Sequence, residues 1–185
     1  MLAMVPNILT VMRILAAPAL ALILTLAQSP AAYSWAFMLF SLAAFTDFLD
    51  GWLARRLGAI SAIGRMLDPI ADKVMVMIAL ATLLAVTGPS PALMLPSLAI
   101  FLREVLISGL REFLGDIKLP VTFAAKAKTT VQMLAIGGLL LAGAVPAAPL
   151  LQIAALGLLW IAAGLTIFTG IDYLRQAGPH LKGRD

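Results

Sequence analysis

From residue 129 to residue 171 the sequence reads TTVQMLAIGGLLLAGAVPAAPLLQIAALGLLWIAAGLTIFTGI, 43 residues without a charged side chain. A helix that crosses a bilayer needs about 20 mostly apolar residues, so this stretch is long enough for two such helices. The segment VPAAP at 145–149 interrupts it, and proline clusters are typical of turns. The stretch therefore predicts a pair of membrane-spanning helices at 120–144 and 149–174.

Two further uncharged stretches extend this pattern toward the N-terminus. Residues 14–46 are interrupted by QSPAAYS at 28–34, and residues 74–102 are interrupted by TGPSP at 87–91. Each half is again long enough to cross a bilayer. We therefore expect an all-α polytopic membrane protein in which residues 1–185 form a single domain with six transmembrane helices. The expected helices span residues 6–28, 32–57, 61–87, 92–115, 120–144 and 149–174.

The composition excludes two other classes of protein. Apolar residues make up 62% of the 185 residues and charged residues only 12%, whereas soluble domains average about 45–50% and about 25%. A soluble globule would lack polar residues to cover its surface, and a disordered chain is far less apolar. The absence of cysteine excludes disulfides, thiolate metal sites and cysteine nucleophiles.

The distribution of charge predicts an orientation in the membrane. The net charge is +4, and the basic residues lie between apolar runs, which favours a membrane surface over nucleic acid as the partner. The three interruptions carry no charge, and the positive-inside rule then assigns both termini and the two remaining connections to the cytoplasm. The first helix carries Arg13 rather than a basic start, so we expect it to be retained and not cleaved as a signal peptide. The basic residues at the cytoplasmic side are Arg55, Arg56, Arg65, Arg111, Lys118, Lys126, Lys128, Arg175, Lys182 and Arg184.

Four aspartates gather within 26 residues near the cytoplasmic ends of the second and third expected helices. Asp47 and Asp50 are three residues apart, and Asp68 and Asp72 are four apart, so each pair shares a helix face. If the two faces meet, four carboxylates converge at the membrane, which is costly unless cations balance them. Hard divalent cations prefer such oxygen ligands, so we expect Mg²⁺ or Mn²⁺, with two ions able to support a phosphoryl-type displacement.

The residues alone allow two alternatives to a metal-dependent enzyme. In the first alternative, the aspartates are solvated charges in a loop. Their position within helical runs disfavours this alternative. In the second, the protein is a cation carrier that uses the four aspartates. Transporters place such groups near the bilayer midplane, whereas these four lie toward one side, which is typical of a site open to the cytoplasm.

The aspartates belong to a longer pattern of residues. The segments D47-F-L-D-G-W-L-A-R55 and G64-R-M-L-D-P-I-A-D72, separated by eight residues, match all eight fixed positions of the pattern DxxDGxxAR, eight residues, GxxxDxxxD. This pattern resembles the signature of the CDP-alcohol phosphotransferases. Members of that family are six-helix membrane enzymes, so the resemblance implies the same number of spans as the uncharged stretches predict.

The resemblance implies a reaction and a role for each matching residue. Such enzymes bind a CDP-linked lipid with divalent metal, and a hydroxyl of a second alcohol attacks the lipid phosphate while CMP leaves. By position, Asp47, Asp50 and Asp68 resemble metal ligands, and Asp72 resembles a further ligand and the general base. The residues that would line the CDP-lipid site are Gly51, Ala54, Arg55 and Gly64. The resemblance adds Asn7, Thr10 and Arg13 to this site; the alternative role of these three residues is to cap and anchor the first helix.

Three further segments indicate the acceptor alcohol. VPNILTVMR at 5–13, REVLISGLREFLG at 103–115 and KAKTTVQM at 126–133 resemble the branch of the family that makes phosphatidylglycerophosphate from CDP-diacylglycerol and sn-glycerol 3-phosphate. Cationic side chains suit that acceptor, because arginine binds phosphate through two hydrogen bonds. The predicted acceptor-phosphate residues are Arg103, Arg111, Lys126 and Lys128.

Alternatives remain open for these cations and for the acceptor. Lys126 and Lys128 also obey the positive-inside rule without any ligand, and Arg103 has a neighbouring acid, Glu104, with which it can pair. A sister enzyme that uses inositol phosphate or phosphatidylglycerol as acceptor is the alternative within the family. The family resemblance also suggests a homodimer.

Overall fold

The computed structural model describes the backbone of residues 5–57, 62–115 and 123–181, and the side chains of residues 8–47, 66–67, 69–115 and 127–179. The described backbone is almost wholly helical, as the uncharged stretches predict. Each helix begins within three residues of its expected start. The helices are α1 (Val5–Leu26), α2 (Pro30–Leu57), α3 (Ala62–Thr87), α4 (Pro91–Leu114), α5 (Phe123–Ala144) and α6 (Pro149–Leu181).

The expected end of the last helix, at residue 174, is wrong, because α6 continues to Leu181. The expected end lies soon after Ile171, where the apolar run stops. Tyr173 and Ala177 are nevertheless buried, and they pack against Ile107 and Leu114 of α4. Contact with a neighbouring helix therefore carries α6 past its apolar segment.

Proline and glycine account for several helix boundaries. Pro30, Pro91 and Pro149 occupy the first positions of α2, α4 and α6, where the missing N–H is not required and the fixed φ angle suits a helix. At the end of α4, Gly115 has φ of 59° and its N–H donates to carbonyls of the last turn. Gly88, with φ of 83°, follows α3. Positive φ angles of this kind favour glycine, so these two residues terminate their helices.

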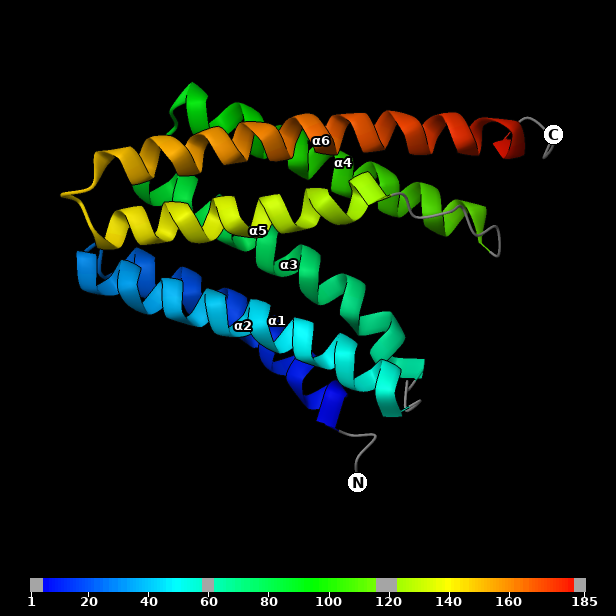
Figure 1. Ribbon diagram of the computed structural model, residues 1–185, viewed down its shortest axis with the longest axis horizontal. Coiled ribbons are helices and arrows are strands. Elements are labelled where there is room, and N and C mark those ends of the chain that lie inside the picture. The colour runs from blue at the N-terminus through cyan, green and yellow to red at the C-terminus, as the bar shows by residue number, and fades with distance from the viewer. Residues whose placement is uncertain (1–4, 58–61, 116–122, 182–185) are drawn as a thin grey trace.

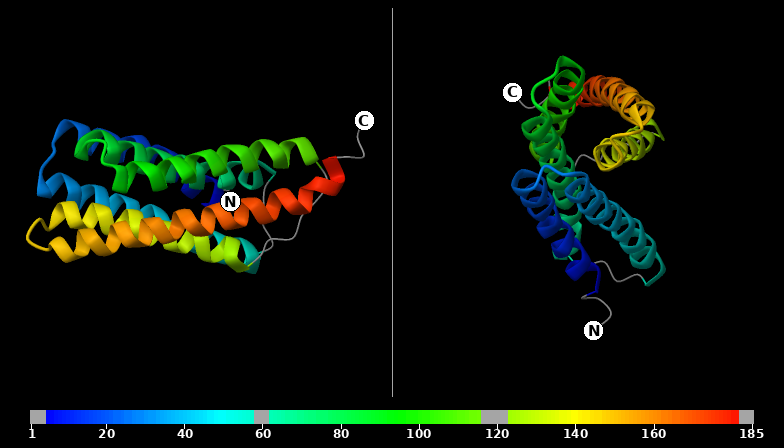
Figure 2. Two further views of the ribbon diagram at one scale, coloured as in Figure 1. Left: turned by 90° about the horizontal axis from the view of Figure 1, so that it is seen from above. Right: turned by 90° about the vertical axis from the view of Figure 1, so that its left-hand side faces the viewer.

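The short connections gather at one end of the molecule. The turns that join α1 to α2, α3 to α4 and α5 to α6 lie at the left in Figure 1, and both termini lie toward the other side. These turns contain the three interruptions of the long uncharged stretches, at 28–34, 87–91 and 145–149, so the fold groups them as the charge pattern predicts. The end-on view in Figure 2 shows α1, α2 and α3 on one side of the bundle and α4, α5 and α6 on the other.

Helix packing links the two halves of the bundle through α5. α1 packs against both α2 and α3, α5 packs against α2 and α6, and α4 packs mainly against α6. Two close approaches of α5 depend on glycine. A Cβ atom added to Gly143 would lie 2.2 Å from the ring of Tyr33 in α2, and one added to Gly138 would lie 3.0 Å from the Cβ of Ala155 in α6. The fully buried large side chains of the core include Leu20, Leu24, Met75, Leu80, Ile100, Ile136, Leu140 and Leu159.

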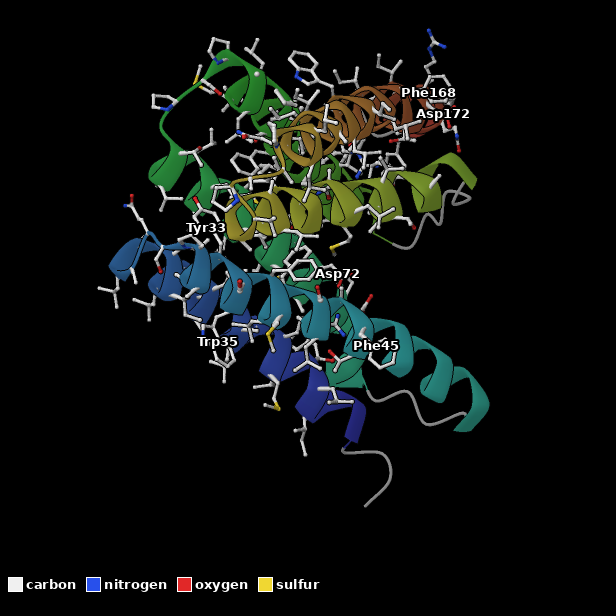
Figure 3. All side chains as sticks on the ribbon, turned by 60° about the vertical axis from the view of Figure 1, so that its left-hand side comes forward. Tyr33, Trp35, Phe45, Asp72, Phe168 and Asp172 are labelled. Carbon is white, nitrogen blue, oxygen red and sulfur yellow. The ribbon has the colours of Figure 1, made fainter. Side chains whose placement is uncertain are left out.

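The outer surface is apolar, as expected of a protein surrounded by lipid. Trp35, Phe45 and Phe168 are each more than half exposed and point away from the bundle in Figure 3. A soluble monomer rarely exposes so many large apolar side chains together. Within the described residues, five helices are long and apolar enough to cross a membrane, namely α1, α3, α4, α5 and α6.

Candidate active site

Arg13 of α1 joins two aspartates of the signature. One of its guanidinium nitrogens, Nη1, lies 2.6 Å from an Oδ1 of Asp47 in α2 and 3.0 Å from an Oδ1 of Asp72 in α3. The Arg13 side chain is only 2% exposed, whereas both carboxylates are partly open to solvent. A charge buried in an apolar helix requires such partners. Because α1 packs on both α2 and α3, it brings Asp47 and Asp72 together at Arg13. Figure 3 labels Asp72 within the bundle.

The structure gives the other signature residues a helical setting. Asp50, Gly51, Ala54 and Arg55 lie in α2, and Gly64 and Asp68 lie in α3. Their side chains lie outside the described residues, as do those of Asn7 and Lys126, so their predicted roles stay predictions. Thr10 is fully buried and lies one turn before Arg13 on α1, on the same helix face.

The residues present fit the chemistry of a divalent cation. Among the described side chains, no three acids or histidines lie close enough to one another to hold a metal ion. Asp47 and Asp72 nevertheless direct carboxylate oxygens at a single cationic nitrogen. Asp50 and Asp68 lie one turn away on the same two helices. An all-oxygen set of donors of this kind suits Mg²⁺ or Mn²⁺.

A cavity of about 480 Å³ begins at Asp72 and extends among α3, α4 and α5. Its volume falls within the usual range for small-molecule sites. Four cationic side chains and two carboxylates line its described wall, so their formal charges sum to +2. The lining residues are Pro69, Asp72, Lys73, Val76, Arg103, Glu104, Arg111, Lys128, Thr129, Thr130, Gln132 and Met133.

Glu104 organises two of the cations in the cavity wall. Lys128 of α5 donates from Nζ to Glu104 Oε1 over 2.5 Å, and Arg103 donates from Nη1 to the same oxygen over 3.1 Å. All three side chains are largely buried. The alternative partner that the sequence indicated for Arg103 is therefore present. Arg103 and Lys128 also border the cavity, so both predicted phosphate residues remain available to a ligand there.

Lys73 is a cavity residue that the sequence reasoning missed. Its ammonium group donates to the hydroxyl of Ser108 in α4, and that hydroxyl donates to the carbonyl oxygen of Glu104 over 2.6 Å. Lys73 directly follows Asp72, so it lies beside the predicted base. A lysine within a membrane helix is itself a signal of function, which could have identified it. Thr129, Thr130 and Gln132 of α5 also line the cavity. They carry no charge, so the sequence gives no comparable indication of a functional role.

Arg111 lies at the cavity near the end of α4. Its guanidinium carbon lies 5.3 Å from the centre of the Tyr173 ring in α6. Arg111 is exposed, whereas Tyr173 is buried. The cavity therefore has Asp72 and Lys73 on α3, Arg103 and Arg111 on α4, and Lys128 on α5.

The same residues carry a family assignment. A family model described as CDP-alcohol phosphatidyltransferase matches residues 3–168, which include the whole signature and all the charged residues that line the cavity. The chain belongs to this family. The resemblance that the aspartate pattern indicated is therefore confirmed.

Individual relatives agree along nearly the whole length of the chain. A protein of Cereibacter sphaeroides is 45% identical, and the match covers 96% of this chain and 97% of the relative. A Rickettsia bellii protein is 42% identical over 92% and 93% of the two chains. A Pseudomonas fluorescens protein is 39% identical over 96% and 92%. All three relatives are named CDP-diacylglycerol–glycerol-3-phosphate 3-phosphatidyltransferase.

Proposed function

We propose that this protein transfers the phosphatidyl group of CDP-diacylglycerol to sn-glycerol 3-phosphate, giving phosphatidylglycerophosphate and CMP. The names of the relatives support both substrates. The observation that carries the proposal is the cavity that links Asp72 to four cations. Glycerol 3-phosphate carries about two negative charges near neutral pH, since the second pKa of a phosphate monoester is about 6. The formal charge of +2 on the described wall balances that acceptor.

The chain's own residues suit each part of this reaction. Arg103, Arg111 and Lys128 hold the acceptor phosphate, and Lys73, which directly follows Asp72, lines the same cavity. Asp72 takes the proton of the attacking hydroxyl. The hydroxyl oxygen forms a bond to the phosphorus that carries diacylglycerol, and the bond from that phosphorus to the CMP oxygen breaks. Arg13 keeps Asp72 close to Asp47 while this occurs.

Divalent metal is part of the proposal. Asp47, Asp50, Asp68 and Asp72 would hold one or two ions of Mg²⁺ or Mn²⁺. When bound, such ions neutralise the negative charge of the diphosphate and of the departing CMP. The support is the oxygen chemistry of this donor set and the convergence of Asp47 and Asp72 on one cationic nitrogen.

The proposed setting is a bacterial cytoplasmic (inner) membrane that the chain crosses six times, with both termini and the active site on the cytoplasmic side. The five apolar helices support this placement, and so does the grouping of the three uncharged connections at one end. α2 would supply the sixth span. We also propose a homodimer, on the resemblance alone.

An acceptor panel tests the proposed function. Purified protein with CDP-diacylglycerol and Mg²⁺ would be offered glycerol 3-phosphate, inositol phosphate, phosphatidylglycerol or serine, and the release of CMP would be measured. We expect release with glycerol 3-phosphate and little with the others. Release with inositol phosphate or phosphatidylglycerol instead would assign the protein to a sister activity. Activity that persists in a strong chelator would remove the metal from the proposal.

A further inference from the structure

Gly170 of α6 lies directly against Arg103. A Cβ atom added to Gly170 would lie 3.1 Å from Cγ of Arg103 and 3.9 Å from its Nε. A carbon–carbon distance of 3.1 Å is shorter than ordinary van der Waals contact, for which separations are about 3.5–4.0 Å. The Arg103 side chain therefore occupies its place in the cavity wall because residue 170 has no side chain.

Tyr173 makes the corresponding contact with Arg111. Its ring centre lies 5.3 Å from the guanidinium carbon, within the range of a cation–π interaction. The ring is 9% exposed and packs with Ile107, Leu114 and Ala177. A fixed ring beneath an exposed, long side chain restricts the positions which that side chain can adopt.

The two contacts come from one face of one helix. Gly170 and Tyr173 are three residues apart, so they lie one above the other on α6. Arg103 and Arg111 are eight residues apart on α4, a little over two turns, and both border the cavity. α6 itself contributes none of the described residues that line the cavity, so it acts on the cavity through the helices beside it, and Arg103 and Arg111 are two lining residues that it contacts directly.

We propose that Gly170 and Tyr173 are positioning residues that hold Arg103 and Arg111 in the geometry needed to bind the acceptor phosphate. This inference rests on the proposed function. Both residues lie beyond residue 168, where the match to the family model ends, so that match assigns them no role. The consequence is that α6 governs affinity for the acceptor without touching it, and leaves the CDP-lipid site unaffected.

A comparison of three glycines on α6 tests the first contact. Gly170→Ala forces the Arg103 side chain to shift by a few tenths of an ångström, whereas a Cβ atom at Gly164 or Gly178 would meet no atom within 4 Å. All three changes improve helix propensity by the same amount. The contact with Arg103 is therefore what distinguishes Gly170→Ala from the other two. We expect Gly170→Ala to raise the KM for glycerol 3-phosphate about three- to tenfold, since small displacements of binding groups are costly. The KM for CDP-diacylglycerol should stay constant, and Gly164→Ala and Gly178→Ala should keep both values.

Two substitutions of Tyr173 test the second contact. Tyr173→Phe keeps the ring and should keep most of the affinity for the acceptor. Tyr173→Leu removes the ring and should raise the KM for glycerol 3-phosphate by about two- to fivefold, the usual size of an exposed cation–π interaction. In an Arg111→Ala background, Tyr173→Leu should add no further loss, because the ring acts through that arginine.

The outcomes separate this inference from the function on which it rests. Wild-type protein that releases no CMP with glycerol 3-phosphate overturns the proposed function and the inference together. Wild-type protein that uses glycerol 3-phosphate, with Gly170→Ala and Tyr173→Leu at wild-type KM, overturns the inference alone. Equal rises in KM for both substrates also overturn it, since they indicate a general structural role. If Gly170→Ala fails to fold, the Tyr173 pair decides the question.

Discussion

Arg13 illustrates how one side chain can connect distant parts of a membrane protein. From α1 it contacts Asp47 of α2, which is 34 residues later, and Asp72 of α3, which is 59 residues later. Both carboxylates are more than a third exposed, so water screens much of their mutual repulsion. We therefore expect the loss of Arg13 to affect catalysis more than folding.

Arg13→Ala should lower kcat about 100-fold, because Asp72 loses the contact that orients it, and misplaced catalytic groups cost about that much. Arg13→Lys should lower kcat less, about tenfold, since its single ammonium group cannot copy the guanidinium. CMP release at saturating substrates measures both effects. Met12→Ala serves as the control, because that neighbouring side chain is exposed on the outer surface. Unchanged kcat in Arg13→Ala would show that Asp72 does not need this partner.

Asp72→Asn tests the general base. We expect kcat to fall by at least about 10²–10⁴-fold, the usual contribution of a base, with a further loss if Asp72 also holds metal. CDP-diacylglycerol should still bind measurably, because three signature aspartates remain. The matched control is Asp172→Asn in α6, whose carboxylate accepts a hydrogen bond from Gln176 outside the cavity. Near-normal turnover in Asp72→Asn would assign the base to another residue.

Single residues differ in how well the sequence predicts their roles. Arg103, Arg111 and Lys128 were predicted to share a site, and the structure places all three around one cavity. The link from Arg13 to Asp47 and Asp72 was not predicted, because it depends on which helices pack together. Glu104 appeared only as a partner for Arg103, since nothing in the sequence indicated that Lys128 of another helix would reach the same oxygen.

Helix α5 packs on both halves of the bundle, against α2 in one and α6 in the other. It reaches α2 at Gly143 and α6 at Gly138, where small residues allow close approach. Such contacts provide van der Waals packing where lipid removes most of the hydrophobic driving force. Since α5 also carries Lys128, its packing against α2 and α6 affects both the cavity and the fold.

Gly143→Ala should destabilise the protein, because the new methyl group would lie 2.2 Å from the Tyr33 ring. Overpacking of this kind costs about 1–3 kcal/mol, which exceeds or offsets the gain of about 1 kcal/mol in helix propensity. Gly157→Ala on α6 gains the same propensity and meets nothing within 4 Å. Thermal unfolding in detergent should therefore give a lower Tm for Gly143→Ala than for Gly157→Ala. A Tm for Gly143→Ala equal to that of Gly157→Ala would mean that Tyr33 moves away without cost.

The positions of the helices were largely predictable, because charge-free runs and proline clusters report directly on the membrane and on turns. Pro30, Pro91 and Pro149 each open a helix within two residues of the expected start. The end of α6 was not predictable in this way. It depends on the burial of Tyr173 and Ala177 against α4, and a hydropathy pattern contains no information about that contact.

For the whole molecule, the orientation in the membrane gives a direct test. The chain has no cysteine, so single-cysteine variants need no other change. Cysteines at Ser29, Pro89 and Ala147 should react with an impermeant reagent added to intact cells, because these connections carry no charge and face outward. A cysteine at Arg175 should react after the cells are opened. Labelling of the Arg175 variant from outside would reverse the orientation and the side from which substrates enter.

The packing of α4 has a consequence for how the protein is made. Ribosomes release the chain from its N-terminus, so α4 is complete before α5 and α6 exist. Yet α4 packs mainly against α6, and its Glu104 pairs with Lys128 of α5. At that stage Lys128 is absent, so Glu104 lacks one of its two ion-pair partners and keeps Arg103 of its own helix. The nascent chain therefore needs a protected environment, at the insertion machinery or beside α3, until its last two helices emerge.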